Sequence, residues 1–212
     1  MERKPTLKLT DAVLRPRAAQ EEAIARESPG PGLAIVGLWA ALSLALVAAT
    51  GTAGIEQQFP ELPPGGFEEI RGPVLLFALL SAAAGPFVWA GGLSALMYLA
   101  ARPFGGGGSF RAMLAGVGLA CAPWVFAGAV QLLLAGVETA FGASVVPESL
   151  GLAVSVAALV WHVALVIIGG SRAAGISYGG AAGSCALSAF GCATAVLFLF
   201  ITLAVLVVGL SR

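Results

Sequence analysis

Charged side chains are scarce in this sequence. Only 10% of the 212 residues are Asp, Glu, Lys or Arg, whereas 58% are hydrophobic and the mean hydropathy is +0.95. Soluble domains carry about 25% charged residues, so this chain has too few charges to cover a water-facing surface. Several apolar runs are about 18 or more residues long, which is typical of membrane spans. The composition excludes a soluble globular domain and predicts an integral membrane protein.

Cysteine and histidine are also rare, with three and one residues respectively. Cys121, Cys185 and Cys192 all lie in apolar runs, and an odd number of thiols in such runs indicates packing residues rather than disulfides or a metal site. The formal net charge is zero and no general basic patch exists, which argues against a nucleic-acid partner. Because no nucleophile–base pair and no cofactor fingerprint occur, we expect neither enzymatic activity nor a cofactor.

The apolar runs predict an all-α membrane bundle of five transmembrane helices. A polar arm at 1–30 with a short amphipathic helix precedes a membrane domain at 31–212. The expected spans are 33–50, 73–101, 112–137, 150–168 and 182–209. Pro86 and Pro123 fall inside the second and third spans, and proline removes a backbone hydrogen bond, so we expect both spans to be kinked or interrupted. We expect the arm helix to be solvated or interfacial, with membrane-surface or partner docking as the alternative.

The connecting segments predict the orientation. Those after the second and fourth spans contain Arg102, Arg111 and Arg172 and no acid, whereas those after the first and third contain six acids and one arginine. Short cytoplasmic loops are enriched in Lys and Arg, so we expect the N-terminus inside and the C-terminus outside. The alanine- and glycine-rich composition indicates a bacterial source, and hence the cytoplasmic (inner) membrane.

The sequence "RPFGGGGSFRAML" at 102–114 contains four consecutive glycines between two spans. A phosphate-binding loop requires a preceding strand and a following lysine, and neither is expected here. Two interpretations remain open. The run is either a plain flexible turn or a contact for lipid headgroups through Arg102 and Arg111, aided by the free N–H groups at the start of the next helix.

Polar and small residues inside the spans provide two further candidate sites. Ionisable groups in hydrocarbon are functional candidates, and His162 in the fourth span has Gln131 in the third as its expected partner. The fifth span has small residues at turn spacing, which let helices approach closely in a bundle or an oligomer. This candidate packing interface comprises Gly180, Ser184, Ser188 and Cys192.

The order of these features resembles the Yip domain family. The sequence "GGSFR" at 107–111 is followed by Ala122-Pro123 in the next span, and "GGSRAAGISYGGAAGS" precedes the last span. The resemblance implies a five-span membrane protein with a short cytoplasmic arm and no enzymatic activity. It also implies a tight inside turn at the four glycines, with Ser109 capping the third span. The signature of eukaryotic members is reduced here to "EIRGP" at 69–73, so we do not expect a role in binding GTPases.

Two functional hypotheses follow. The first is a non-enzymatic scaffold or accessory subunit of a membrane complex, which contacts the bilayer and either its own copies or a larger partner. The second is a small transporter or channel subunit with a site near the interrupted spans and His162, since discontinuous helices often mark binding sites.

Overall fold

The computed structural model of the chain describes residues 15–51, 66–142 and 147–191. Within these ranges the fold is all-α, without a strand. The elements are α2 (Pro16–Ala25), α3 (Gly30–Thr50), α5 (Gly66–Ala100), the 3₁₀ turn η1 (Arg102–Phe104), α6 (Phe110–Ala120), α7 (Ala122–Phe141) and α8 (Glu148–Ala174). A further helix runs over 178–191.

Four helical segments of the described chain are long and apolar enough to cross a membrane. They are Gly30–Thr50, Arg71–Ala100, Phe110–Phe141 and Ser149–Ala174. These segments match the first four expected spans; the second is one residue longer than the sequence indicates, and the other three are three to seven residues longer. Most of the fifth expected span, 182–209, lies outside the described residues, so the count of five and the orientation stay predictions.

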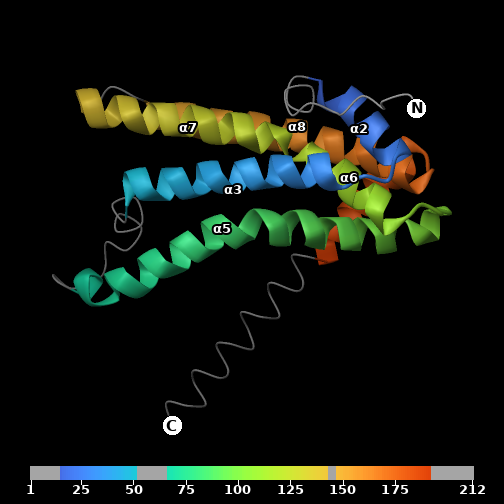
Figure 1. Cartoon of the computed structure of the whole chain (residues 1–212), viewed down its shortest axis with the longest axis horizontal. Helices are drawn as coiled ribbons and strands as arrows, with labels where there is room; N and C mark the ends of the chain where they lie inside the picture. Colours follow the sequence, from blue (N-terminus) through green and yellow to red (C-terminus); the bar gives the residue numbers. More distant parts are fainter. Residues whose placement is uncertain (1–14, 52–65, 143–146, 192–212) are drawn as a thin grey trace, which may run out of the picture.

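The spanning helices run side by side along the molecule, and α2 and α6 lie at one end of it (Figure 1). α3 packs against α5, α6 and α7, while α8 packs against α6 and α7. Half of the most apolar window of the third span is buried, compared with 17–22% for the other three spans. α6 and the first residues of α7 are therefore the most buried part of the described bundle, whereas the rest of α7 is partly or fully exposed.

Glycine allows the helices around α6 to approach closely. A Cβ added at Gly118 would lie 2.9 Å from the Cα of Gly32 in α3, and one added at Gly116 would lie 3.3 Å from the carbonyl oxygen of Gly169 in α8. Contacts below 3.4 Å are tighter than most side chains tolerate. These two crossings, with buried alanines around them, produce the tight packing that small residues allow in membrane bundles.

The two prolines inside spans have different effects. α5 stays helical through Pro86 and bends along its length (Figure 1), whereas the third span is interrupted between α6 and α7, just before Pro123. The third span is therefore interrupted, as expected, and α5 is bent without being interrupted. Large apolar side chains along α5 are exposed, including Leu76, Phe77 and Leu80, as expected for a lipid-facing helix.

Candidate functional site

The interruption of the third span leaves a backbone acceptor free. Pro123 has no N–H to donate, and the N–H of Trp124 donates to the carbonyl of Cys121 at 3.0 Å. In an uninterrupted α-helix the N–H of Trp124 would bond to the carbonyl of Ala120, four residues back. The Ala120 carbonyl therefore needs another partner inside the bundle.

His162 of α8 provides that partner. Its Nδ1 lies 2.7 Å from the carbonyl oxygen of Ala120, and the indole N–H of Trp89 donates to its Nε2 at 3.4 Å. An indole nitrogen can only donate, so Nε2 accepts and Nδ1 carries the proton of a neutral imidazole. The side chain is 2% exposed. His162 therefore supplies the hydrogen bond that the Ala120 carbonyl lacks at the interruption between α6 and α7.

Tryptophan rings surround His162 and join four helices. The rings of Trp39 and Trp124 stack at 5.8 Å, and Trp124 and Trp89 lie 5.9 and 6.3 Å from the imidazole. Aromatic pairs in such arrangements contribute about 0.5–1.5 kcal/mol beyond the area they bury. This aromatic cluster connects α3, α5, α7 and α8 at the level of the interruption, and the sequence analysis did not identify it.

Gln131 does not pair with His162, contrary to the sequence-based expectation. Its Nε2 donates to the hydroxyl of Ser155 at 3.0 Å, while His162 bonds to Ala120 and Trp89. The reason is the antiparallel register of α7 and α8. Gln131 and Ser155 lie equally far in sequence from residue 143, and Trp124 and His162 do as well, so each pair sits at one depth. Counting outward from the connecting loop would have identified both pairs.

The four-glycine run is packed against the end of α8 rather than free. The N–H of Gly107 donates to the carbonyl of Ala174 at 3.1 Å, and a Cβ added at Gly108 would lie 1.7 Å from the carbonyl oxygen of Ala173. The run therefore forms a turn with a close backbone contact at Gly108, while a Cβ at Gly105 or Gly107 would meet nothing within 4 Å; the flexibility of the turn stays a prediction. The glycines allow the backbones to touch, which no residue with a Cβ would permit at Gly108.

The tight turn starts the third span as the family resemblance implies. Gly105 has a φ of +80°, a backbone conformation that glycine adopts most readily. The hydroxyl of Ser109 accepts a hydrogen bond from the N–H of Ala112 at 3.1 Å, so Ser109 caps α6.

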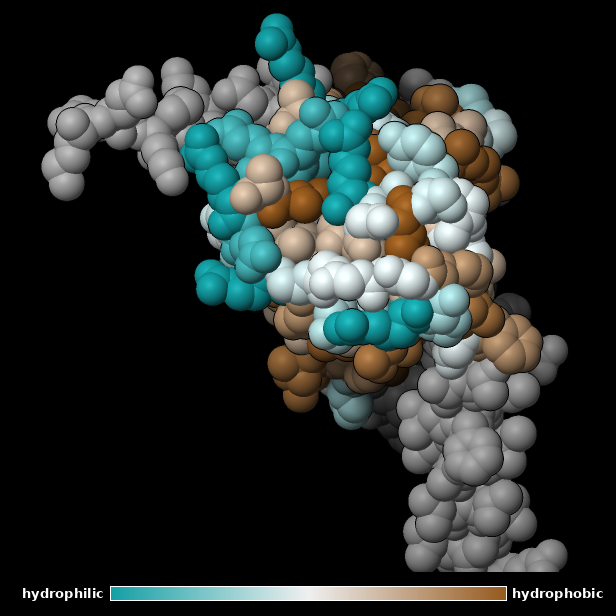
Figure 2. All heavy atoms as spheres, turned by 90° about the vertical axis from the view of Figure 1, so that its right-hand side faces the viewer, coloured by the Kyte–Doolittle hydropathy of each residue, from teal (hydrophilic) through white to brown (hydrophobic). Residues whose placement is uncertain are grey.

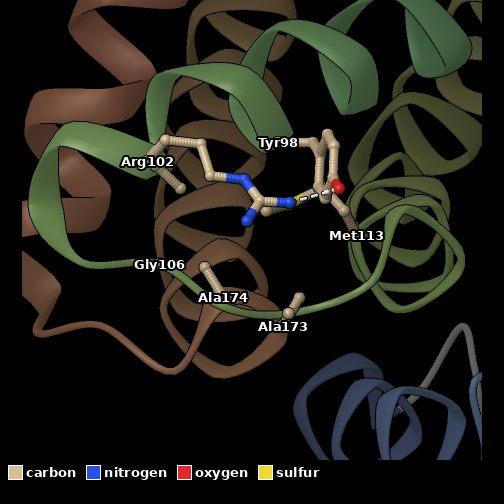
Figure 3. A pocket seen from close by; sticks show the side chains of 8 residues that line it. Tyr98, Arg102, Gly106, Met113, Ala173 and Ala174 are labelled. Atoms are coloured by element: carbon tan, nitrogen blue, oxygen red, sulfur yellow. Dashed lines mark hydrogen bonds between the residues drawn. The ribbon is translucent and has the colours of Figure 1, made fainter.

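The two arginines that flank this turn are both exposed. The guanidinium carbon of Arg102 lies 4.6 Å from the centre of the Tyr98 ring, and its Nη2 donates to the Tyr98 hydroxyl (Figure 3). The depression beside this pair, lined by Met113 and Ala173 among others, is too narrow to admit a water molecule. Contact of Arg102 and Arg111 with lipid headgroups is thus compatible with their exposure and stays a prediction.

The small-residue face of the last described helix packs inside the bundle. Ser184 is fully buried, and its hydroxyl oxygen lies 2.9 Å from the carbonyl oxygen of Gly180 and 3.1 Å from that of Ala100, either of which can accept its one proton. Ser188 is also buried, and a Cβ added at Gly180 would lie 3.3 Å from the Cβ of Phe104. The described part of this face serves intramolecular packing, while Cys192 lies outside the described residues.

The helix of the polar arm is docked onto the bundle, with Ala19, Gln20 and Ala23 buried. Gln20 is 0% exposed, and its side-chain amide donates to the carbonyls of Gly116 in α6 and Leu165 in α8, at 2.8 and 3.1 Å. The carboxylate of Glu21 lies 2.7 Å from a guanidinium nitrogen of Arg172. A solvated helix does not describe α2. The sequence signal for this docking is Gln20, which lies on the same helix face as Ala19 and Ala23. That face has little apolar area, so the sequence did not predict its burial.

The described cysteines are free thiols. Cys121 is buried, and its thiol donates to the carbonyl of Val117 at 3.5 Å, while Cys185 is half-buried. Among the residues that the structure describes, no group of three or more His, Cys, Asp or Glu side chains is placed to hold a metal ion.

These observations define the class of the protein. Helices of membrane-spanning length, small-residue crossings and hydrogen-bonded polar side chains in the interior characterise a polytopic helical membrane protein. The family model described as Yip1 domain matches residues 11–211, and the chain belongs to the Yip1 domain family. No curated protein and no solved structure matches the chain.

Proposed function

We propose that this Yip1 domain protein is a non-enzymatic scaffold or accessory subunit of a complex in the bacterial inner membrane. It acts by packing its membrane helices against a larger partner or against copies of itself. The Yip1 family is not a known enzyme family, which is in line with a role in assembly rather than in catalysis.

The observation that carries this proposal is the use of the polar side chains inside the spans. His162 and Gln131 bond to other parts of the chain, and the hydroxyls of Ser94, Ser184 and Ser188 donate to backbone carbonyls. A general base or a nucleophile must be able to reach a substrate proton or carbon. The bonds of His162 and Gln131 join helices, whereas the three serines bond to the carbonyl four residues back in their own helix. All five side chains therefore have partners within the chain, and the membrane-facing surface left for other proteins is apolar.

The experiment is photo-cross-linking in native membranes, followed by mild-detergent purification and mass spectrometry. A photoreactive amino acid is placed at Phe77 or Phe141, whose side chains are 73% and 74% exposed, and at fully buried Val36 as the control. We expect a discrete protein adduct at an exposed position and only intramolecular products at Val36. Adducts with lipid alone at every exposed position tested would contradict the proposal. A self-adduct would identify a homo-oligomer, and a stoichiometric foreign adduct would identify the partner.

Two features of the structure argue against the transporter alternative. α5 continues through Pro86, and His162 closes the interruption of the third span instead of facing a pathway. Flux through proteoliposomes that disappears in the His162→Ala variant would restore this alternative. Flux equal to that of protein-free liposomes would remove it.

The proposed orientation places the N-terminus and the end with α2 in the cytoplasm. Hydrophilic side chains gather at this end of the molecule (Figure 2). Arg15 and Arg17 lie at the start of α2, Arg102 lies in η1, Arg111 lies in the first turn of α6 and Arg172 lies in the last turn of α8. This distribution supports the positive-inside assignment.

A further inference from the structure

A groove runs between the start of α2 and the outer face of α8. It has a volume of about 490 Å³ and is open along one side. Arg15, Arg17 and Glu21 line its α2 wall, and Trp161, Ala164 and Ile168 line its α8 wall. The volume lies in the range of ligand sites, which is about 300–1,000 Å³.

The α8 wall belongs to the membrane-facing surface of the bundle. Trp161 is 39% exposed, and its neighbours Val160 and Val163 are 66% and 37% exposed. The Trp161 ring stacks on Phe126 of α7 at 5.6 Å, which holds it at the side of the groove. Because this wall continues the lipid-exposed face of α8, a hydrocarbon chain can enter the groove sideways without leaving the bilayer.

The α2 wall carries an excess of positive charge. Glu21 accepts from Arg172 at 2.7 Å and lies 3.5 Å from the Nε of Arg17. Arg15, which is exposed, and Arg17 are thus the two guanidinium groups that line the groove, against the single carboxylate of Glu21, which is already paired with Arg172 outside the groove. The first turn of α2 adds to the positive potential, because its N-cap residue makes no side-chain capping bond. An anion with one or more apolar tails matches both walls.

We propose that this groove binds one anionic phospholipid from the leaflet on the α2 side of the membrane. The phosphate contacts Arg15 and Arg17, and an acyl chain lies along Trp161, Ala164 and Ile168. The site differs from the candidate headgroup contacts Arg102 and Arg111, which flank the glycine turn. It requires no protein partner, so it stands or falls independently of the scaffold proposal.

The test is thermal unfolding of the purified full-length chain in mild detergent. The additives are phosphatidylglycerol, phosphatidylcholine with the same acyl chains, and glycerol 3-phosphate as a headgroup without chains. At a phosphatidylglycerol concentration about 100 times Kd, the unfolding midpoint should rise by roughly 5–10 °C, from the stabilisation that a ligand gives and the usual temperature scale for a chain of this size. Neither phosphatidylcholine nor glycerol 3-phosphate should reproduce this rise.

Four variants separate the two walls of the groove from general effects. The double variant Arg15→Gln/Arg17→Gln removes two positive charges from the groove, and Ala164→Phe fills its apolar part. Each should abolish the rise in unfolding midpoint that phosphatidylglycerol causes. Arg15→Lys/Arg17→Lys keeps the charges and should keep the shift. Ala157→Phe places the same ring two turns earlier on the exposed face of α8 and should also keep it.

Several results would overturn the proposal. Equal shifts with both phospholipids would show that the charge is not recognised, and a shift with glycerol 3-phosphate alone would show an anion site without a lipid. An undiminished rise in the unfolding midpoint of Ala164→Phe would show that phosphatidylglycerol does not bind in this groove. This result is decisive even if Arg15→Gln/Arg17→Gln fails to fold. A loss in Arg102→Gln/Arg111→Gln as large as in Arg15→Gln/Arg17→Gln would reduce the effect to general surface charge.

Discussion

The hydrogen bond of His162 shows why one polar side chain is tolerated in the centre of an apolar bundle. The interruption at Pro123 removes a donor from the ladder, and an unpaired carbonyl in an apolar interior costs about 1–3 kcal/mol. The imidazole supplies the missing donor from another helix at 2.7 Å. The histidine and the proline therefore form one structural unit, although they lie on different spans.

Replacing His162 with phenylalanine should destabilise the bundle by about 1–3 kcal/mol, because an aromatic ring is kept while the donor to Ala120 is lost. Gln131→Leu is the comparison, since it removes one interhelical hydrogen bond of a kind that averages about 0.6 kcal/mol in membranes. Reversible unfolding in micelles, followed by tryptophan fluorescence, measures both free energies. Equal losses in the two variants would argue against the special role of His162.

The glycine turn permits a matched comparison of adjacent residues. A Cβ at Gly108 would collide with the carbonyl oxygen of Ala173, whereas nothing lies within 4 Å of a Cβ at Gly107. We expect Gly108→Ala to destabilise the fold by about 1–3 kcal/mol through overpacking, and Gly107→Ala to change stability by less than about 0.5 kcal/mol. Thermal unfolding of the two variants in one detergent checks this order. Similar midpoints would mean that the turn can move away from α8.

The sequence predicted the residues of interest better than their partners. His162, Gln131 and the glycine run were all identified, but a partner depends on register, on depth and on which carbonyl an interrupted helix releases. Gln131 is a clear case. Its residue type indicated an interhelical hydrogen bond, and the position of the α7–α8 loop decided that the bond goes to Ser155.

Among the elements, α2 behaves least as its composition suggests. Its buried face consists mainly of alanine, so little apolar area is available for docking, and the amide of Gln20 adds two interhelical hydrogen bonds. Both acceptors belong to helices that cross at Gly116 and Gly169, where the backbones are close enough for one amide to reach α6 and α8. Through these two hydrogen bonds, α2 stabilises the crossing of α6 and α8.

Gln20→Met should release α2, because the side-chain length is kept and both hydrogen bonds are lost. Glu21→Gln is the comparison within the same helix, since it weakens an exposed ion pair worth about 0–1 kcal/mol. Hydrogen–deuterium exchange in lipid nanodiscs measures the outcome. We expect peptides covering 16–25 to exchange several-fold faster in Gln20→Met than in Glu21→Gln. Unchanged exchange in Gln20→Met would mean that the alanines alone hold the helix.

The first four spans were predictable from the sequence, because apolar length is a physical requirement for crossing a bilayer. The effect of each proline was not. Pro123 interrupts its span where His162 can satisfy the released carbonyl, whereas α5 continues through Pro86. Whether a proline interrupts or bends a helix depends on partners from other helices, and a single span in the sequence does not contain them.

At the scale of the whole molecule, hydrophilic side chains gather at the end of the bundle that carries α2 (Figure 2). This end has the docked α2 and the glycine turn, which is flanked by exposed Arg102 and Arg111. Juxtamembrane arginines near an anionic leaflet contribute about 1 kcal/mol each. The same end carries the proposed lipid groove, so orientation decides which leaflet supplies the lipid.

Cysteine labelling in intact cells tests the proposed orientation. Gly107→Cys places a thiol in the glycine turn, and Thr139→Cys places one near the end of α7. Both positions are exposed, and both substitutions keep every arginine and acid that sets the orientation. With the N-terminus inside, a membrane-impermeant maleimide should label Thr139→Cys in intact cells and Gly107→Cys only after permeabilisation. The unsubstituted chain is the control for its own cysteines. The reverse pattern would invert the orientation and move the lipid groove to the outer leaflet.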